Sequence, residues 1–292
     1  MELFCAANDP LYNRHMPEPK PLLYETHMHT PLCKHAEGDP EEYAAMAERR
    51  GLKGILVTCH NPTDIEWGWR VRMAYEEFEE YVALVARATK EYAGRVDVRL
   101  GIESDYAPGM EKWLEKLHKE AEFHHVLGSV HPQIPEYRAK YFINNDAVAY
   151  QRTYFEHLAM AAESGLFDTL SHPDLVKNIF PSKWNVQLVM DSIEAALDRI
   201  AKTGVAMELN TSGVNKDIQE MNPGPEILKQ IQKRNIPIVV GADAHRPGRV
   251  AADFDVALDQ LKSLGFTKVS YFLNRKRQDV PIDEARASLL GD

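Results

Sequence analysis

Seven hydrophobic, strand-like runs recur along the chain, separated by segments in which apolar residues follow a helical spacing. The runs cover residues 22–29, 53–60, 96–103, 124–131, 167–172, 205–210 and 236–243. Between them, apolar side chains stand three or four positions apart, the spacing typical of amphipathic helices. Glycine favours the left-handed conformation that ends a helix, and five of these segments end in one: Gly51, Gly94, Gly165, Gly204 and Gly265. Residues 266–282 are expected to form a final strand and tail.

Seven strand–helix units without a Gly/Ser-rich linker predict one α/β domain, a closed or nearly closed parallel TIM-like (β/α)7 barrel over residues 22–292. Residues 1–21 are rich in proline and aperiodic, so we predict an N-terminal arm on the domain surface. A doubly wound open sheet is the alternative. It is less favoured because the polar residues described next come from six of the seven strands, the first and the seventh among them, and an open sheet would hold its outer strands far apart.

Histidines and two carboxylates stand at the C-terminal ends of these strand-like runs. They are His27, His29, His35, His60, Glu103, His131, His172, Asp243 and His245. In parallel α/β proteins the strand C-termini share one edge, where the loops converge on the active site. His27 and His29 project to the same side of an extended segment, because side chains alternate along a strand. Imidazole and carboxylate groups gathered in this way predict a catalytic centre with two or three divalent metal ions, of zinc, manganese or iron.

Composition limits the other possibilities. Apolar and charged contents of 44% and 27% are ordinary for a globular protein. A net charge of −10 argues against binding to a nucleic acid duplex. No apolar run is long enough to span a membrane, and the first twenty residues lack a signal-peptide pattern, so we predict a cytoplasmic protein. Of the three cysteines, Cys33 and Cys59 are expected to be packed free thiols, with soft metal ligands as the alternative.

The nine residues stand in an order that resembles the polymerase and histidinol phosphatase (PHP) superfamily of metal-dependent phosphoesterases. That family has H-x-H after the first strand, a further His, then His, Glu, His and His at successive strand ends, and D-x-H after the seventh strand. The resemblance covers residues 22–275. Within the superfamily, the sequence is most similar to the monofunctional histidinol-phosphate phosphatases, as in the segment HMHTPLCKHAEGDPEEYAAMAERRGLKGILVTCHNP. This chain departs from the family in having Glu25 where Asp is usual and Cys59 where an acidic residue is common.

The resemblance implies a distorted seven-stranded barrel with three ions. One would be held by His27, His29, Glu103 and Asp243, with Glu103 bridging to a second ion at His131 and His172. A third would be held by His35, His60 and His245. On the same basis we predict Glu103, Asp243 and His245 as catalytic residues. The implied reaction is hydrolysis of a small phosphomonoester, with L-histidinol phosphate, an intermediate of histidine biosynthesis, as the leading substrate.

Several residues outside these nine are candidates for binding the substrate. Arg138 follows His131, Arg246 follows His245, and Asn210 ends the sixth strand at the same mouth, so these residues could contact the phosphate ester. The loop that contains Trp67, Trp69, Arg70 and Arg72 follows His60 and could cover a substrate ring or simply pack on the domain.

Three other functions remain open from the sequence. The first is a PHP-type phosphoesterase that acts on a nucleoside monophosphate, an oligonucleotide or a sugar phosphate. The second is a non-catalytic module that uses its metals for folding, which the presence of all nine residues argues against. The third is a metal-dependent amidohydrolase, although the chain has no lysine at a strand end equivalent to Glu103. The oligomeric state is not predicted.

Overall fold

The strands lie side by side in the order in which the chain forms them. The computed structural model describes residues 20–63 and 67–290. Its strands are β1 (Tyr24–Glu25), β2 (Gly54–Val57), β3 (Asp97–Asp105), β4 (His125–Ser129), β5 (Thr169–Leu170), β6 (Ala206–Asn210), β7 (Ile238–Gly241), β8 (Lys268–Leu273) and β9 (Lys276–Pro281). Pairing from β1 to β8 is parallel, and β9 returns antiparallel to β8. The sequential order agrees with the predicted series of strand–helix units and excludes the doubly wound alternative, whose order reverses.

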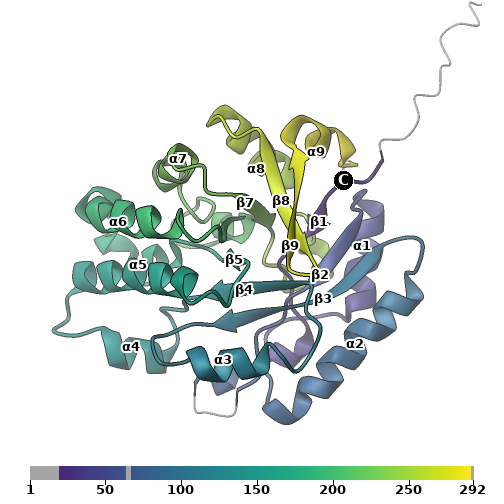
Figure 1. Ribbon diagram of the computed structural model, residues 1–292, viewed down its shortest axis with the longest axis horizontal. Helices are drawn as coiled ribbons and strands as arrows, with labels where there is room; N and C mark the ends of the chain where they lie inside the picture. Colours follow the sequence, from purple (N-terminus) through teal and green to yellow (C-terminus); the bar gives the residue numbers. More distant parts are fainter. Residues whose placement is uncertain (1–19, 64–66, 291–292) are drawn as a thin grey trace, which may run out of the picture.

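Helices surround the strands, which occupy the centre of the ribbon (Figure 1). They are α1 (Pro40–Arg49), α2 (Phe78–Glu91), α3 (Glu111–Leu117), α4 (Pro135–Tyr141), α5 (Ala147–Glu163), α6 (Met190–Ile200), α7 (Pro225–Lys233), α8 (Phe254–Ser263) and α9 (Ile282–Ser288). Short 3-10 helices are η2 (Pro31–Cys33), η3 (Trp69–Val71), η4 (Tyr75–Glu77), η5 (Leu175–Asn178), η6 (Pro181–Lys183), η7 (Val186–Leu188), η8 (Thr211–Asn215) and η9 (Pro247–Arg249). The helices α4 and α9 were not predicted. Residues 1–19, most of the predicted arm, lie outside the described residues.

Backbone hydrogen bonds join the first and seventh strands at their carboxyl ends. Ala244, just beyond β7, donates its N–H to the carbonyl of His27 and accepts the N–H of His29, each at 2.9 Å. The side chain of Thr26 also donates to the carbonyl of Val240 on β7 at 2.9 Å. The residues that follow β1 and β7 are therefore held together, which brings the two ends of the seven-strand series to one place.

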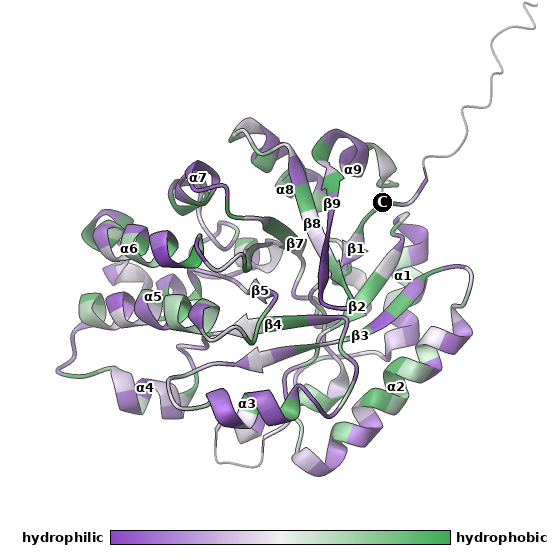
Figure 2. Ribbon diagram, in the orientation of Figure 1, coloured by the Kyte–Doolittle hydropathy of each residue, from purple (hydrophilic) through white to green (hydrophobic). Residues whose placement is uncertain are grey.

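The hairpin of β8 and β9 runs across the amino ends of the strands. Phe272 on β8 stacks on His125 of β4 with ring centroids 5.1 Å apart. At the turn, Arg275 pairs with Asp168 at 2.5 Å and donates its backbone N–H to the carbonyl of His124. Residues 266–282, predicted as a final strand and tail, thus form the two strands β8 and β9. Figure 2 shows β9 as mostly hydrophilic, in keeping with its exposed side chains.

Local sequence signals account for the helix ends. Asp39 precedes α1, and its backbone N–H donates to the carboxylate of Glu42 at 3.0 Å. The Asp146 side chain accepts the backbone N–H groups of Val148 and Ala149 at the start of α5. All five glycines expected to end helical segments have positive φ: Gly51, Gly94, Gly165, Gly204 and Gly265. Within the described residues, no helix is both long enough and apolar enough to cross a bilayer.

A fully buried lysine holds the loops that follow β5 and β6. The Lys177 ammonium donates to the carboxylates of Asp174 and Glu220 and to the carbonyl of Met221, each at 3.0 Å. The same Asp174 carboxylate accepts the N–H of Gly224 at 2.8 Å. Because Asp174 and Lys177 are both fully buried, each charge depends on the other for its compensation.

Replacing Lys177 by Met should lower the free energy of unfolding by about 3 kcal/mol, because it leaves the Asp174 carboxylate buried without its cation. Urea unfolding followed by circular dichroism measures the change. The control is Lys183→Met, at an exposed position in η6, which should change stability by less than about 0.5 kcal/mol. Equal stabilities of the two variants would contradict the role given to Lys177.

Candidate metal centre

The nine side chains singled out in the sequence converge at the carboxyl ends of the strands. Ring centroids lie 4.0 Å apart for His29 and His245 and 4.4 Å apart for His29 and His60. They lie 4.6 Å apart for His35 and His245 and 5.0 Å apart for His131 and His172. Residues separated by more than two hundred positions are thus in contact. That they bind metal stays a prediction.

Glu103, at the end of β3, lies at the centre of this group and is 1% exposed. Its Oε1 lies 3.1 Å from His172 Nε2, 3.3 Å from His131 Nε2 and 3.4 Å from His27 Nε2. Its Oε2 lies 2.5 Å from His60 Nδ1 and 3.6 Å from His29 Nε2. Burial alone would raise the pKa of Glu103, but the surrounding imidazoles lower it well below its usual value. The carboxylate is therefore ionised, and both of its oxygens face nitrogen donors.

Asp243 supplies the second carboxylate. Its Oδ1 lies 3.1 Å from His29 Nε2, 3.3 Å from His245 Nδ1 and 3.7 Å from His27 Nε2. Burial opposes ionisation, yet the charge of His27 and the hydrogen bond from His29 keep the pKa of Asp243 well below its usual value. The backbone of Asp243 has φ +48° and that of His172 has φ +29°. Such conformations are uncommon outside glycine and cluster at functional sites.

Most of the histidines have one ring nitrogen fixed by the protein. His27 Nδ1 lies 2.8 Å from Glu208, and His131 Nδ1 lies 2.5 Å from Asp105. His35 and His245 direct Nδ1 at backbone carbonyls, 2.7 Å and 3.0 Å away. In each of these four histidines the other ring nitrogen, Nε2, faces the cluster. The Nε2 atoms of His35 and His245 lie 3.0 Å apart. This is the arrangement that orients histidine ligands in metal sites.

Two buried carboxylates that support the histidines were not predicted from the sequence. Glu208 on β6 is fully buried and also accepts the backbone N–H of His172 at 2.8 Å. Asp105 forms two hydrogen bonds with the buried guanidinium of Arg72, at 2.7 Å and 2.8 Å. Signals for both were present: Glu208 interrupts the apolar run VAMELN, and Asp105 lies on the same strand face as Glu103.

Several buried polar atoms of the cluster form no hydrogen bond of good geometry among the described residues, although two of them, His60 Nδ1 and Glu103 Oε2, lie 2.5 Å apart. The atoms are His27 Nε2, His29 Nδ1, His60 Nδ1, Glu103 Oε2 and His172 Nδ1. Unpaired buried polar atoms are costly, and native proteins rarely leave them without a partner. Sets of three ligand atoms lie within 4.8 Å of one another, among them His27, His29 and Asp243. The donor set therefore fits divalent cations.

The three predicted substrate contacts lie in different surroundings. The guanidinium of Arg138 lies over the rings of Phe142 and Phe180, 5.5 Å and 5.0 Å from their centroids. Arg246 is exposed next to His245. Asn210 is fully buried, and its amide donates to Glu208 at 3.0 Å, so it holds a residue that supports His27. Substrate contact by these three residues stays a prediction.

The two described cysteines lie beside the histidines. Cys33 and Cys59 are fully buried free thiols, as expected. The Sγ of Cys59 accepts the N–H of Thr30 at 3.4 Å and its hydroxyl at 3.2 Å. Both sulfurs lie within 4.8 Å of a ring nitrogen of His29, so the soft-ligand alternative stays open.

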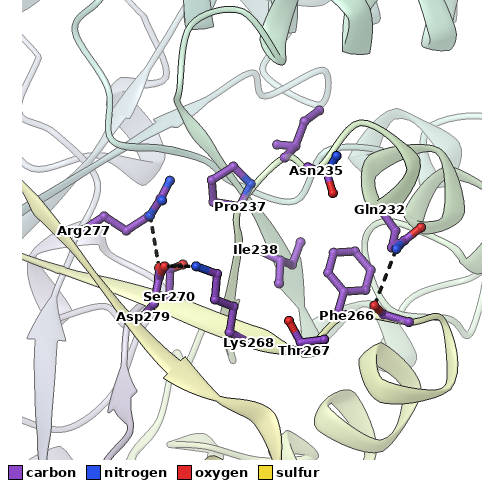
Figure 3. Close-up of a pocket in the computed structure, with 12 residues that line it drawn as sticks. Gln232, Asn235, Pro237, Ile238, Phe266, Thr267, Lys268, Ser270, Arg277 and Asp279 are labelled. Carbon is purple, nitrogen blue, oxygen red and sulfur yellow. Dashed lines mark hydrogen bonds and ion pairs between the residues drawn. The ribbon is translucent and has the colours of Figure 1, made fainter.

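Two cavities lie at opposite ends of the strands. One of about 440 Å³ is lined by residues 68–72 and 133–136 together with His35 and His60. The other, of about 310 Å³, lies at the amino end of β7 (Figure 3). The Lys268 and Arg277 side chains at its wall both pair with Asp279. No histidine or cysteine is among the described residues that line it, so it is separate from the candidate metal centre.

Residues 25–212 match the model of the PHP domain. The chain belongs to the PHP family. It is 39% identical over 264 residues to a probable histidinol-phosphatase of Deinococcus radiodurans, covering 88% of this chain and 98% of that protein. It is 24% identical to the histidinol-phosphatase of Bacillus subtilis, covering 80% of this chain and 97% of that protein.

A solved structure shares the fold of this PHP protein. It is the histidinol phosphate phosphatase of Lactococcus lactis subsp. lactis in complex with zinc, L-histidinol and phosphate. The TM-score is 0.73 at 17% sequence identity, and the match covers 87% of this chain and 98% of that chain.

The stability of chelator-treated protein should fall as the pH rises from about 6.5 to about 9. Burial lowers the pKa of His29, but the hydrogen bond to Asp243 and the charges of Glu103 and Asp243 outweigh it and raise the pKa to about 9. Folded His29 therefore keeps a proton that the unfolded chain releases above its usual pKa of 6.5. The expected loss is up to about 3 kcal/mol, measured by urea unfolding at several pH values.

His29→Asn should flatten this pH dependence, whereas His118→Asn should leave it in place. The pKa of His118 is lowered to about 3 by burial, so this side chain is neutral throughout the window. A wild-type stability that stays level or rises between pH 6.5 and 9 would contradict the electrostatics assigned to the cluster.

Proposed function

We propose that this protein is a metal-dependent phosphatase that hydrolyses L-histidinol phosphate to L-histidinol and phosphate, a step of histidine biosynthesis in the cytoplasm. The observation that carries the proposal is the convergence of nine potential ligands, Glu103 among them, with buried atoms that form no hydrogen bond of good geometry. The substrate is supported by the probable histidinol-phosphatase of Deinococcus radiodurans and the histidinol-phosphatase of Bacillus subtilis, each matched over at least 80% of this chain. It is also supported by the L-histidinol and phosphate in the complex from Lactococcus lactis.

The proposed ligands are the nine residues at the strand ends, which would hold two or three ions of zinc, manganese or iron. Two groups of three donors that share no residue support at least two ions: His27, His29 and Asp243; and His60, Glu103 and His131. Glu103 faces nitrogen donors with both oxygens, so it is suited to bridge two ions. When bound, such ions would lower the pKa of a coordinated water and neutralise charge on the phosphate.

The chain's own residues fix the geometry that this reaction needs. Ser129 donates its hydroxyl to Glu103 Oε1 at 2.7 Å, which holds the carboxylate between the histidines. Glu208 holds His27, and the Arg72–Asp105 pair holds His131. Because these side chains are already held in place, they do not need to move during the reaction. We propose catalytic roles for Glu103, Asp243 and His245, which lie together in the cluster around His29.

The direct test is release of phosphate from L-histidinol phosphate by purified protein, before and after chelation and after zinc or manganese is restored. The expected result is release that chelation abolishes and metal restores. If only p-nitrophenyl phosphate is hydrolysed with the same metal dependence, the protein is a phosphatase with another substrate. No hydrolysis of any phosphate ester would contradict the proposal and reopen the amidohydrolase and non-catalytic alternatives.

Glu103→Gln and His29→Ala should each lower kcat by at least about 100-fold, because each removes a ligand from the centre of the cluster. Bound metal, measured by inductively coupled plasma mass spectrometry, should fall in both variants. Glu284→Gln is the control, because it removes one negative charge at an exposed position on α9. Activity close to wild type in Glu103→Gln would rule out the assignment of this site.

A further inference from the structure

The cavity beside His35 and His60 has features that the hydrolysis of a phosphate ester does not by itself require. Residues 68–72, around η3, form one wall, and residues 133–136, at the start of α4, form another. Its volume of about 440 Å³ lies within the range of small-molecule sites. Because two of the proposed ligands are part of its lining, a phosphate ester bound at the metal centre can extend into it.

We propose that this cavity holds the organic half of the substrate, with Glu136 binding its ammonium group and Trp69 contacting its ring. This inference rests on the proposed function, since it assumes that the phosphate lies at the metal centre. It assigns two specificity-determining residues, neither of which belongs to the nine proposed ligands.

The charges around the cavity favour an ammonium group at Glu136. Arg72 is fully buried, and its guanidinium is occupied by Asp105 and by the carbonyl of Val71. The guanidinium of Arg70 lies 5.0 Å from the ring centroid of Trp69. Among the ion pairs of the described residues, none involves Glu136, whose carboxylate is half-buried at the cavity wall. A partly desolvated carboxylate without a cation is suited to accept hydrogen bonds from an ammonium group.

A hydrogen bond fixes Glu136 relative to the opposite wall. Its Oε2 accepts the backbone N–H of Gly68 at 3.3 Å, which leaves Oε1 for a ligand. Gly68 has φ +62°, and a Cβ there would lie 3.2 Å from the Cδ1 of Ile134. The two walls therefore approach closely at this point, and the Glu136 carboxylate is held by the segment that also carries Trp69.

The apolar part of the lining suits a flat ring. Trp69 is 52% exposed, which is unusual for a tryptophan, and it lines the cavity together with Val71, Ile134 and Pro135. An indole face can stack on an imidazole ring, and it attracts the ring more strongly when the imidazole is protonated. The cavity thus offers a carboxylate and an aromatic surface next to the proposed phosphate site, which matches an amine-bearing imidazole phosphomonoester.

The test compares kcat/KM for three phosphate esters. L-Histidinol phosphate carries both the ammonium and the ring, 3-(imidazol-4-yl)propyl phosphate lacks the ammonium, and ethanolamine phosphate lacks the ring. Glu136→Gln keeps a carbonyl oxygen for the Gly68 N–H and removes only the charge. It should lower kcat/KM for L-histidinol phosphate about 10- to 100-fold and leave imidazolylpropyl phosphate unchanged. Glu115→Gln, on the exposed surface of α3, is the charge-matched control and should change neither value.

Trp69→Leu separates the ring from the ammonium. It should lower kcat/KM about 10-fold for both imidazole esters and leave ethanolamine phosphate unchanged. Equal losses for all three esters in either variant would indicate general damage to the loop and overturn the inference.

The same assays distinguish a wrong role for Glu136 from a wrong substrate. If wild type hydrolyses L-histidinol phosphate and Glu136→Gln does so equally well, the function stands and the role of Glu136 is refuted. If wild type hydrolyses p-nitrophenyl phosphate but not L-histidinol phosphate, the proposed substrate is wrong and the inference falls with it.

Discussion

The site depends on a single buried carboxylate that five imidazoles surround. Glu103 is 1% exposed, so its charge would be very costly to bury without compensation. His27, His60 and His131 lower its pKa, and Ser129 donates a hydrogen bond to it. Because these groups follow different strands, the cluster forms only when the strands stand in their native order. Metal binding would add to this compensation, since cations satisfy the ring nitrogens and carboxylate oxygens that have no other partner.

Around this carboxylate, a second set of side chains fixes the histidines. Glu208, Asp105 and backbone carbonyls accept hydrogen bonds from ring nitrogens that face away from the cluster. The backbone has positive φ angles at His172 and Asp243, whose side chains point into the cluster. Positive φ angles and buried charges at one location are features that cluster at functional sites.

The sequence predicted the series of strands and the meeting of nine side chains, because both follow from periodic patterns and from the shared carboxyl edge of parallel strands. It did not predict the support of those side chains. Glu208 and Asp105 are single polar residues in buried strands, and their partners lie 181 and 26 positions away. A substrate contact by Arg138 was predicted from the sequence, and it stays a prediction. In the structure the guanidinium of Arg138 lies over the rings of Phe142 and Phe180. Pairing across such distances depends on the three-dimensional packing, which residue spacing does not encode.

The central claim is that the buried cluster is a polymetal centre built around Glu103. The measurement that tests it most directly is anomalous X-ray scattering at the zinc, manganese and iron edges, on crystals of protein purified without chelator. We expect two or three peaks, each about 2.0–2.3 Å from histidine nitrogens and carboxylate oxygens, with one peak on either side of Glu103. A map without peaks at Glu103, in a protein that still hydrolyses phosphate esters, would contradict it.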